Sequence, residues 1–105
     1  MPHLIYCTCP DMLVAQRIAR YLIAEKLAAC VNILPGVQSV YEWQGLIETA
    51  QEHLLLIKSP QRNYPEIEAA IKSLHPYQLP EIIAVAIERG SDEYLTWIDT
   101  SPSTP

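Results

Sequence analysis

The sequence has no phenylalanine, only three glycines and three cysteines, and no run of lysine and arginine residues. The odd number of cysteines, without the spacing of a disulfide scaffold, favours a reducing compartment. A net charge of −5 argues against nucleic acid or an anionic membrane as the main partner. The most apolar runs, residues 54–57 and 82–87, are far too short to span a bilayer, and the amino terminus does not resemble a signal peptide. These absences predict a soluble, cytoplasmic protein with no nucleic-acid partner and no membrane insertion.

Sequence patterns that mark common catalytic sites are also missing. There is no glycine-rich phosphate loop, no HExxH, no GxSxG and no spaced pair of CxxC motifs. Cys30 has no base nearby in the sequence that could activate its thiol, so buried packing is the better interpretation of this residue. The sequence therefore predicts that the protein is not an enzyme.

The composition that is present is typical of one globular domain. The chain has 105 residues, of which 50% are hydrophobic and 18% are charged. We expect a single domain over residues 1–100, followed by a disordered tail over residues 101–105. Six tyrosines and two tryptophans favour half-buried places such as interfaces and clefts, because each ring has a polar tip that needs a partner.

Hydrophobic periodicity predicts seven elements joined by short connections. Period-two or continuous apolar patterns predict strands over residues 3–9, 29–43, 47–58 and 79–88, with a bend at Pro35-Gly36 and a tight turn at Gln44-Gly45. Helical spacing predicts helices over residues 12–28 and 65–74, and a short final helix carrying Tyr94, Leu95 and Ile98. The two middle strands are much longer than a typical strand of roughly five or six residues.

This β-α-β-β-α-β-α order matches the α+β, ferredoxin-like plan, with an extended hairpin between the second and third strands and a short C-terminal helix. In that plan two helices cover one face of a four-stranded antiparallel sheet. The other face, which carries many apolar residues, and the long hairpin both need cover. The sequence therefore predicts a small oligomer.

Three groups of motifs resemble the CutA family, in the same order along the chain from about Ile5 to Ile98. They are Ala28-Ala29-Cys30-Val31-Asn32 with Pro35-Gly36 and Tyr41-Glu42-Trp43-Gln44-Gly45, then His75-Pro76-Tyr77 with Leu79-Pro80-Glu81-Ile82, and finally Tyr94-Leu95-Thr96-Trp97-Ile98. The family comprises divalent-cation tolerance proteins. The resemblance implies a ferredoxin-like fold, a homotrimer held by the extended hairpin, copper binding, and a likeness to PII signalling trimers, which bind small molecules between subunits.

Cys7, His75 and Glu81 are the candidate metal ligands. Cys7 and Cys9 alternate along a strand and can point to the same face, where thiolates would suit copper(I) or zinc(II). Packing as small buried hydrophobes is the alternative for both cysteines, and for Cys9 it is the favoured one. Cys7 gains weight because copper-binding family members use a cysteine at the matching position. Imidazole is a good ligand, although His75 could instead cap helix carbonyls.

Two features qualify this metal site. Some family members carry two adjacent histidines at the second motif, whereas this chain has Leu74 before His75, so one expected ligand is absent. Glu81 could supply an oxygen donor or pair with a lysine. His3 and His53 are expected to face solvent. Copper is the cofactor that the resemblance implies, and zinc is not excluded.

Tyr41, Trp43, Lys58, Arg62 and Tyr77 form a second candidate site. In a trimer several of them could line a cleft between subunits, where Lys58 and Arg62 would bind an anion. Packing at an interface is the alternative for the aromatic residues, and solvated charge is the alternative for the cations.

The leading functional hypothesis is a homotrimeric protein that binds copper or another divalent cation and acts in divalent-cation tolerance. The second is a PII-like sensor that binds an anionic metabolite between subunits and signals to an unidentified protein partner. A third is a stable scaffold whose role lies in assembly alone.

Overall fold

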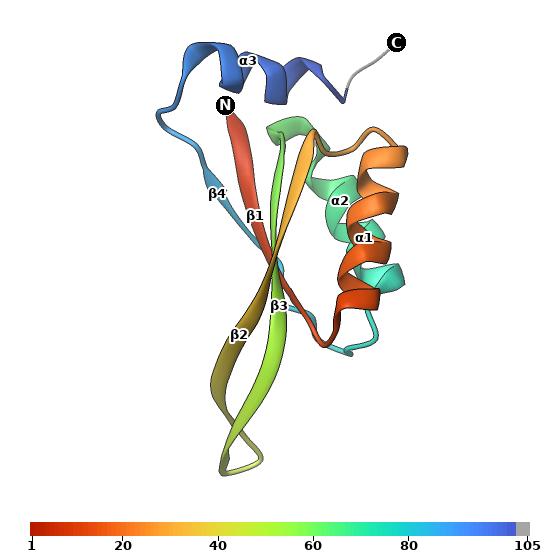
Figure 1. Cartoon of the computed structure of the whole chain (residues 1–105), viewed down its shortest axis with the longest axis vertical. Helices are drawn as coiled ribbons and strands as arrows, with labels where there is room; N and C mark the ends of the chain where they lie inside the picture. The colour runs from red at the N-terminus through yellow and green to blue at the C-terminus, as the bar shows by residue number, and fades with distance from the viewer. Residues whose placement is uncertain (103–105) are drawn as a thin grey trace.

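The computed structural model describes residues 1–102 and contains eight elements in these residues (Figure 1). In chain order they are β1 (Pro2–Cys9), α1 (Met12–Ala24), β2 (Cys30–Trp43), β3 (Leu46–Pro60), the 3-10 turn η1 (Gln61–Asn63), α2 (Tyr64–Leu74), β4 (Ile83–Ala86) and α3 (Asp92–Thr100). Within these residues no helix has both the length and the apolar character that a membrane crossing requires.

The four strands form one antiparallel sheet in the order β2-β3-β1-β4. Helices α1 and α2 lie together on one face of this sheet, and α3 crosses the end that is far from the hairpin tip (Figure 1). This arrangement confirms the predicted α+β, ferredoxin-like fold with an extended hairpin and a C-terminal helix.

The core lies between the helices and one face of the sheet. Its sheet side is formed by alternate residues of β1 and β3, including Ile5 and Ile57, and its helix side by residues such as Ile18 and Ile71, all fully buried. The alternate positions point to the opposite face and are also apolar. They are Leu4, Tyr6, Leu54, Leu56, Ile83 and Val85, all of which are partly or well exposed. Of the described elements only α3 lies against this face, at the end where Lys58 contacts Tyr94, so most of this apolar sheet face has no covering layer within residues 1–102.

The hairpin arm formed by β2 and β3 extends well beyond the helices (Figure 1). The predicted bend at Pro35-Gly36 is a bulge, because the pairing register shifts between Leu34 and Val37 and Gly36 has a φ of 78°. The predicted turn is also present: Gln44 and Gly45 both have positive φ, 51° and 81°, as a type I′ turn requires.

Two predicted elements are too long. The helix predicted over residues 12–28 begins as expected, with the Asp11 carboxylate accepting from the Val14 amide at 2.9 Å, but it ends at Ala24. Lys26 adopts a left-handed φ of 59°, and the Leu27 amide donates back to the Leu22 carbonyl, so the chain closes the helix early.

The strand predicted over residues 79–88 is only Ile83–Ala86. It pairs with residues 3–6 of β1, and the preceding segment around Tyr77 instead turns toward the hairpin arm. The strand prediction was wrong at both ends, because the apolar pattern does not reveal that only four residues of this segment pair with β1.

At the C-terminal end, Ser91 caps α3, because its hydroxyl accepts from the Tyr94 amide, and the helix buries Ile98. Ser101 and Pro102 form a turn after it. The remaining part of the predicted tail, residues 103–105, lies outside the described residues.

Candidate functional site

Cys7, Cys9 and His75 form a buried three-donor cluster. One potential ligand atom from each residue lies within 4.8 Å of the others. The two cysteines come from alternate positions of β1, so both point to the helix-covered face, and His75 follows the last residue of α2. The structure thus brings together Cys7 and His75, as the sequence predicts, and adds Cys9, for which the sequence favours packing.

Hydrogen bonds hold the His75 ring in one orientation. Its Nδ1 lies 3.1 Å from the backbone amide of Tyr77, and its Nε2 lies 2.8 Å from the carbonyl oxygen of Thr8. Because an amide can only donate, Nδ1 must accept, and the ring proton is assigned to Nε2, which donates to Thr8. The His75 amide also donates to the Ile71 carbonyl, which ends α2. The capping role considered for His75 is therefore present, made by its backbone rather than its ring.

The two thiols titrate as a pair. The pKa of Cys7 is raised well above that of an ordinary thiol, because its proton is shared with Cys9 and because burial disfavours a charge. The same contact lowers the pKa of Cys9. Because the sulfurs bind a cation as thiolates, metal binding at this cluster must release protons.

The cluster fits a soft metal ion. Two thiolates and an imidazole are donors that copper(I) and zinc(II) prefer. Ligand atoms bound tetrahedrally to one zinc ion at about 2.3 Å for sulfur and about 2.1 Å for nitrogen lie about 3.6–3.8 Å apart. The observed limit of 4.8 Å means that the donor atoms would have to approach one another by at most about 1 Å. The His75 ring nitrogen that binds the metal would have to lose its hydrogen bond, which is to the Tyr77 amide for Nδ1 and to the Thr8 carbonyl for Nε2.

Glu81 lies outside this cluster. It is exposed in the segment before β4, and its negative charge is close enough to raise the pKa of Cys7. Its role as an oxygen ligand stays a prediction.

His3 and His53, expected to face solvent, are instead half-buried, and the Nδ1 atom of each is buried without a hydrogen-bond partner within the described chain. Cys30, expected to be buried, is only half-buried.

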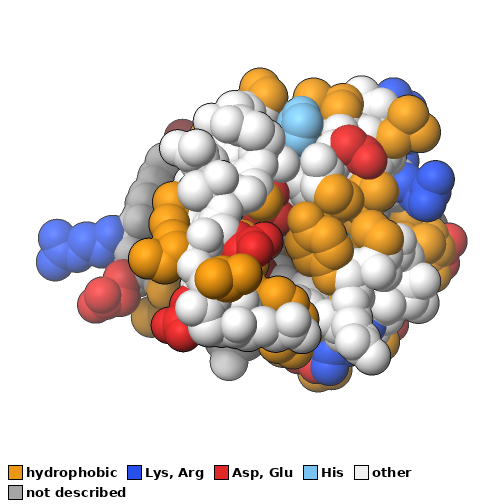
Figure 2. Space-filling view, turned by 90° about the horizontal axis from the view of Figure 1, so that it is seen from below, with side chains coloured by type: hydrophobic (Ala, Val, Ile, Leu, Met, Phe, Trp, Pro, Cys, Tyr) orange, Lys and Arg blue, Asp and Glu red, His pale blue; other side chains and the backbone are white. Residues whose placement is uncertain are grey.

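A pocket of about 770 Å³ adjoins the cluster, between the hairpin arm and the loop after α2. Tyr41 and Trp43 from β2 and Tyr77 from the loop line it, as do Thr8, Glu48, Glu52, Gln78 and Leu79. Its size is that of an ordinary small-molecule site. The structure therefore brings together three of the five residues predicted for a ligand cleft. Figure 2, seen from the hairpin end, shows acidic side chains set among apolar ones in the middle of this view, with lysine and arginine toward the edges.

Glu52 is the pocket residue that sequence reasoning missed. This residue is only 6% exposed, and its carboxylate accepts hydrogen bonds from the Ser39 hydroxyl at 2.6 Å and the Tyr77 hydroxyl at 2.9 Å. Burial and this bond to Glu52 raise the pKa of Tyr77 to about 12. The alternation over residues 37–43 places Ser39, Tyr41 and Trp43 on one face, and pairing across the hairpin adds Glu52 to that face.

Lys58 and Arg62, the two predicted cations of the cleft, lie elsewhere in the chain. Lys58 donates to the Tyr94 hydroxyl at 3.1 Å and sits 5.4 Å from the centre of that ring. Arg62 donates to the carbonyl oxygen of Asp99. Both therefore contact α3, at the end of the sheet opposite to the hairpin tip.

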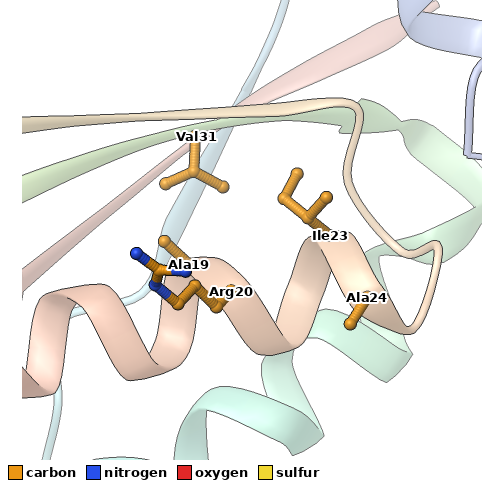
Figure 3. Close-up of a pocket in the computed structure, with 5 residues that line it drawn as sticks. All are labelled: Ala19, Arg20, Ile23, Ala24 and Val31. Atoms are coloured by element: carbon orange, nitrogen blue, oxygen red, sulfur yellow. The ribbon is translucent and has the colours of Figure 1, made fainter.

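A separate hollow of about 410 Å³ lies between α1 and β2 (Figure 3). Val31 points from the strand toward the helix and Ile23 points from the helix toward the strand, with Ala19, Arg20 and Ala24 completing the lining. Among the described residues its walls carry no metal-ligating side chain, and Arg20 supplies their one charged group.

Residues 3–101 match the family model described as CutA1 divalent ion tolerance protein. The chain is 46% identical over 98 residues to the divalent-cation tolerance protein CutA of Thermus thermophilus, covering 93% of this chain and 95% of that protein. It is 42% identical over 97 residues to the chloroplastic protein CutA of Arabidopsis thaliana, covering 92% of this chain and 53% of that protein. The chain thus spans about half the length of the plant relative.

Solved structures share the fold. The crystal structure of CutA1 from the psychrotrophic bacterium Shewanella sp. SIB1 has a TM-score of 0.93 and 42% identity, with 99% of this chain and 96% of that chain covered. The structure of the periplasmic divalent cation tolerance protein CutA from Archaeoglobus fulgidus has a TM-score of 0.90 and 43% identity, with coverage of 93% and 95%. Names that include chloroplastic and periplasmic forms leave the cytoplasmic setting a prediction.

Proposed function

The chain belongs to the CutA1 divalent ion tolerance family, and from this premise we propose that it acts in divalent-cation tolerance by binding a soft metal ion at Cys7, Cys9 and His75. The observation that carries the proposal is the buried three-donor cluster. Copper is the favoured ion and zinc the alternative, because two sulfurs and one imidazole nitrogen suit both. The family name and the name of the Thermus thermophilus relative refer to tolerance rather than catalysis, which supports a non-enzymatic role.

The same proposal includes a homotrimer. Its support is the apolar sheet face, on which Ile83 and Val85 are 56% and 50% exposed, together with the hairpin arm. Strands of 14 and 15 residues present backbone and apolar side chains that a single chain leaves in water. Association of copies through the arm and this face would cover both. The same exposed surface also supports an unidentified protein partner as the alternative occupant.

Competition titration tests the metal proposal. Protein purified without an affinity tag is titrated with copper(I) and with zinc(II) against a chromophoric chelator, as wild type and as Cys7→Ala, Cys9→Ala and His75→Ala. We expect each substitution to weaken binding at least tenfold, because each removes one of three donors. Cys30→Ala is the matched control, since this half-buried cysteine lies outside the cluster and its loss should leave the affinity unchanged.

Two outcomes would count against the proposed site. Equal binding by the wild type and the three cluster variants would remove these residues from it. Equal loss in Cys30→Ala would point to nonspecific thiol binding.

A second candidate function is that of a small-molecule sensor. The observation that favours it is the pocket of about 770 Å³ beside the metal cluster. The Tyr77 backbone and ring join the two: its amide holds His75, and its hydroxyl holds Glu52 in the pocket wall. A ligand that moves Tyr77 when it binds in the pocket would therefore also change the hydrogen bonding of the metal ligand His75.

A further inference from the structure

We infer that His53 is the residue through which a soft metal ion enters and leaves the buried three-donor cluster. This inference rests on the proposed metal site and assigns the path that leads to it. His53 is outside the cluster, so its imidazole would hold the ion only in transit. Three observations carry the inference: the closure of the cluster, the place of His53 in the sheet, and its unpartnered ring nitrogen.

The cluster is closed to the solvent. Cys7 and Cys9 are fully buried, and His75 is 7% exposed. A hydrated cation therefore cannot meet both sulfurs at once, and it has to exchange its water for protein donors one at a time. The sulfurs release their protons to the solvent as they bind, and the oxidation state of the ion does not change. Such a site needs an entry path, which requires a donor that lies beside a cysteine and also extends toward the surface.

His53 lies beside the cluster in the sheet. It is the antiparallel partner of Cys9, the last residue of β1. Directly paired residues of antiparallel strands share a face and have Cβ atoms about 4.5–5.5 Å apart. The alternation along β3 agrees, because Leu55 and Ile57 point into the core from the same side of the strand. His53 thus adjoins Cys9, and it is half-buried whereas Cys9 has no exposed surface.

One ring nitrogen of His53 has no partner. Its Nδ1 is buried, and no hydrogen-bonding group of the described residues contacts it. A buried polar atom without a hydrogen bond is costly, so its presence needs a reason. The lone pair of a neutral imidazole binds copper and zinc well. A nitrogen that is free in the folded chain can bind a passing ion without first losing a hydrogen bond.

Assembly does not provide the missing partner. The homotrimer proposed above covers the opposite face of the sheet and the part of the hairpin arm beyond β1. His53, as the partner of Cys9, lies within the sheet on the face that α1 and α2 cover (Figure 1). Because residues of the same chain already enclose its Nδ1, a neighbouring copy cannot reach this atom. The observation therefore holds for the assembled protein as well as for one chain.

The test separates rates from affinity. A residue on the path changes the rates of loading and release by the same factor, whereas a permanent ligand changes the dissociation constant. Untagged protein is loaded with zinc(II), or with copper(I) under anaerobic conditions. An excess of a chromophoric chelator then removes the metal in a stopped-flow instrument, and the release rate is taken where it no longer depends on chelator concentration. Competition titration with the same chelator gives the dissociation constant, and the two values together give the loading rate.

His53→Leu and His53→Met form a matched pair, because the two side chains have similar volumes and only methionine carries a donor atom. We expect His53→Leu to slow loading and release of both ions at least about tenfold, with an unchanged dissociation constant. His53→Met should restore copper(I) exchange toward the wild-type rate, because a thioether is a soft ligand that suits copper(I). Zinc(II) exchange should stay slow in His53→Met, since zinc in proteins is bound by cysteine, histidine and carboxylate groups.

His3→Leu is the control for the loss of a histidine. His3 is also half-buried, its Nδ1 also lacks a partner in the described chain, and it lies on the same face of the sheet. It precedes Cys7 by four residues of β1, which is about 13 Å along a strand. Its loss should therefore leave both rates unchanged.

Wild-type rates in His53→Leu, or equal slowing by His3→Leu, would overturn the inference and leave the proposed metal site standing. Equal copper(I) rates in His53→Leu and His53→Met would also overturn it, because they would indicate a packing effect. A weaker affinity with an unchanged loading rate would make His53 a permanent ligand and overturn its role in transit. Absence of metal binding by the wild type would overturn both the site and the path.

Discussion

His75→Ala should destabilise the protein even when no metal is present. The ring is 7% exposed, accepts from the Tyr77 amide and donates to the Thr8 carbonyl. It also packs against the Tyr77 ring, with centroids 4.7 Å apart. A histidine that served only as a metal ligand would contribute nothing to the metal-free state, so the stability of that state separates the two roles.

The size of the effect follows from these contacts. Each of the two hydrogen bonds contributes about 0.5–1.5 kcal/mol net. The ring contact adds about 0.5–1.5 kcal/mol. The free energy of unfolding should therefore fall by roughly 3 kcal/mol, which moves a urea midpoint by about 1–3 M.

The assay is urea unfolding followed by circular dichroism in EDTA, at one fixed protein concentration, because any assembly makes stability depend on concentration. His53→Ala is the control: this histidine is half-buried and its Nδ1 has no partner in the described part of the chain, so its removal should cost much less. A loss below about 1 kcal/mol for His75→Ala, or equal losses for both variants, would refute this account of the His75 contacts.

Two further predictions concern the pocket wall and the hairpin arm. The pKa of Tyr77 is raised to about 12 in the folded protein from an ordinary value of 10.0, so its contribution to stability is complete below pH 10 and is lost as the pH rises toward 12. Urea midpoints between pH 7 and 12 should therefore converge for wild type and Tyr77→Phe at the alkaline end; a constant difference would contradict the bond to Glu52. Val40→Asp places a charge on an exposed apolar position of β2 and should convert a trimer into monomers or aggregate in light scattering, whereas Gln38→Asp, on the same face, should not. An intact trimer in Val40→Asp would remove the arm from the interface.

Much of the fold could be predicted because local patterns and the global plan agree. The bulge at Pro35-Gly36 and the turn at Gln44-Gly45 carry residues suited to their backbone angles. The end of α1 could not be predicted, because the left-handed conformation that closes the helix is taken by Lys26 and not by a glycine, which is the usual sequence signal. The limits of β4 depend on its pairing with β1, which is a tertiary property.

The candidate site was predicted in part for a similar reason. Cys7 and Cys9 share a strand face by simple alternation, but only the fold places His75 against them. Glu52 was missed because its burial comes from the loop that carries Tyr77, far away in the sequence. The sequence predicts Lys58 and Arg62 in a cleft between subunits, and within one chain both contact α3, so their place in such a cleft stays a prediction.

X-ray absorption at the zinc or copper edge of the metal-loaded, untagged protein tests the central claim most directly. A metal held by Cys7, Cys9 and His75 should show two sulfur neighbours at about 2.3 Å and one imidazole nitrogen at about 2.0–2.1 Å for zinc. Cys9→Ala should lose one sulfur, while Cys30→Ala should leave the spectrum unchanged. A spectrum with only nitrogen and oxygen neighbours, or one that Cys7→Ala and Cys9→Ala do not alter, would contradict the proposed metal site.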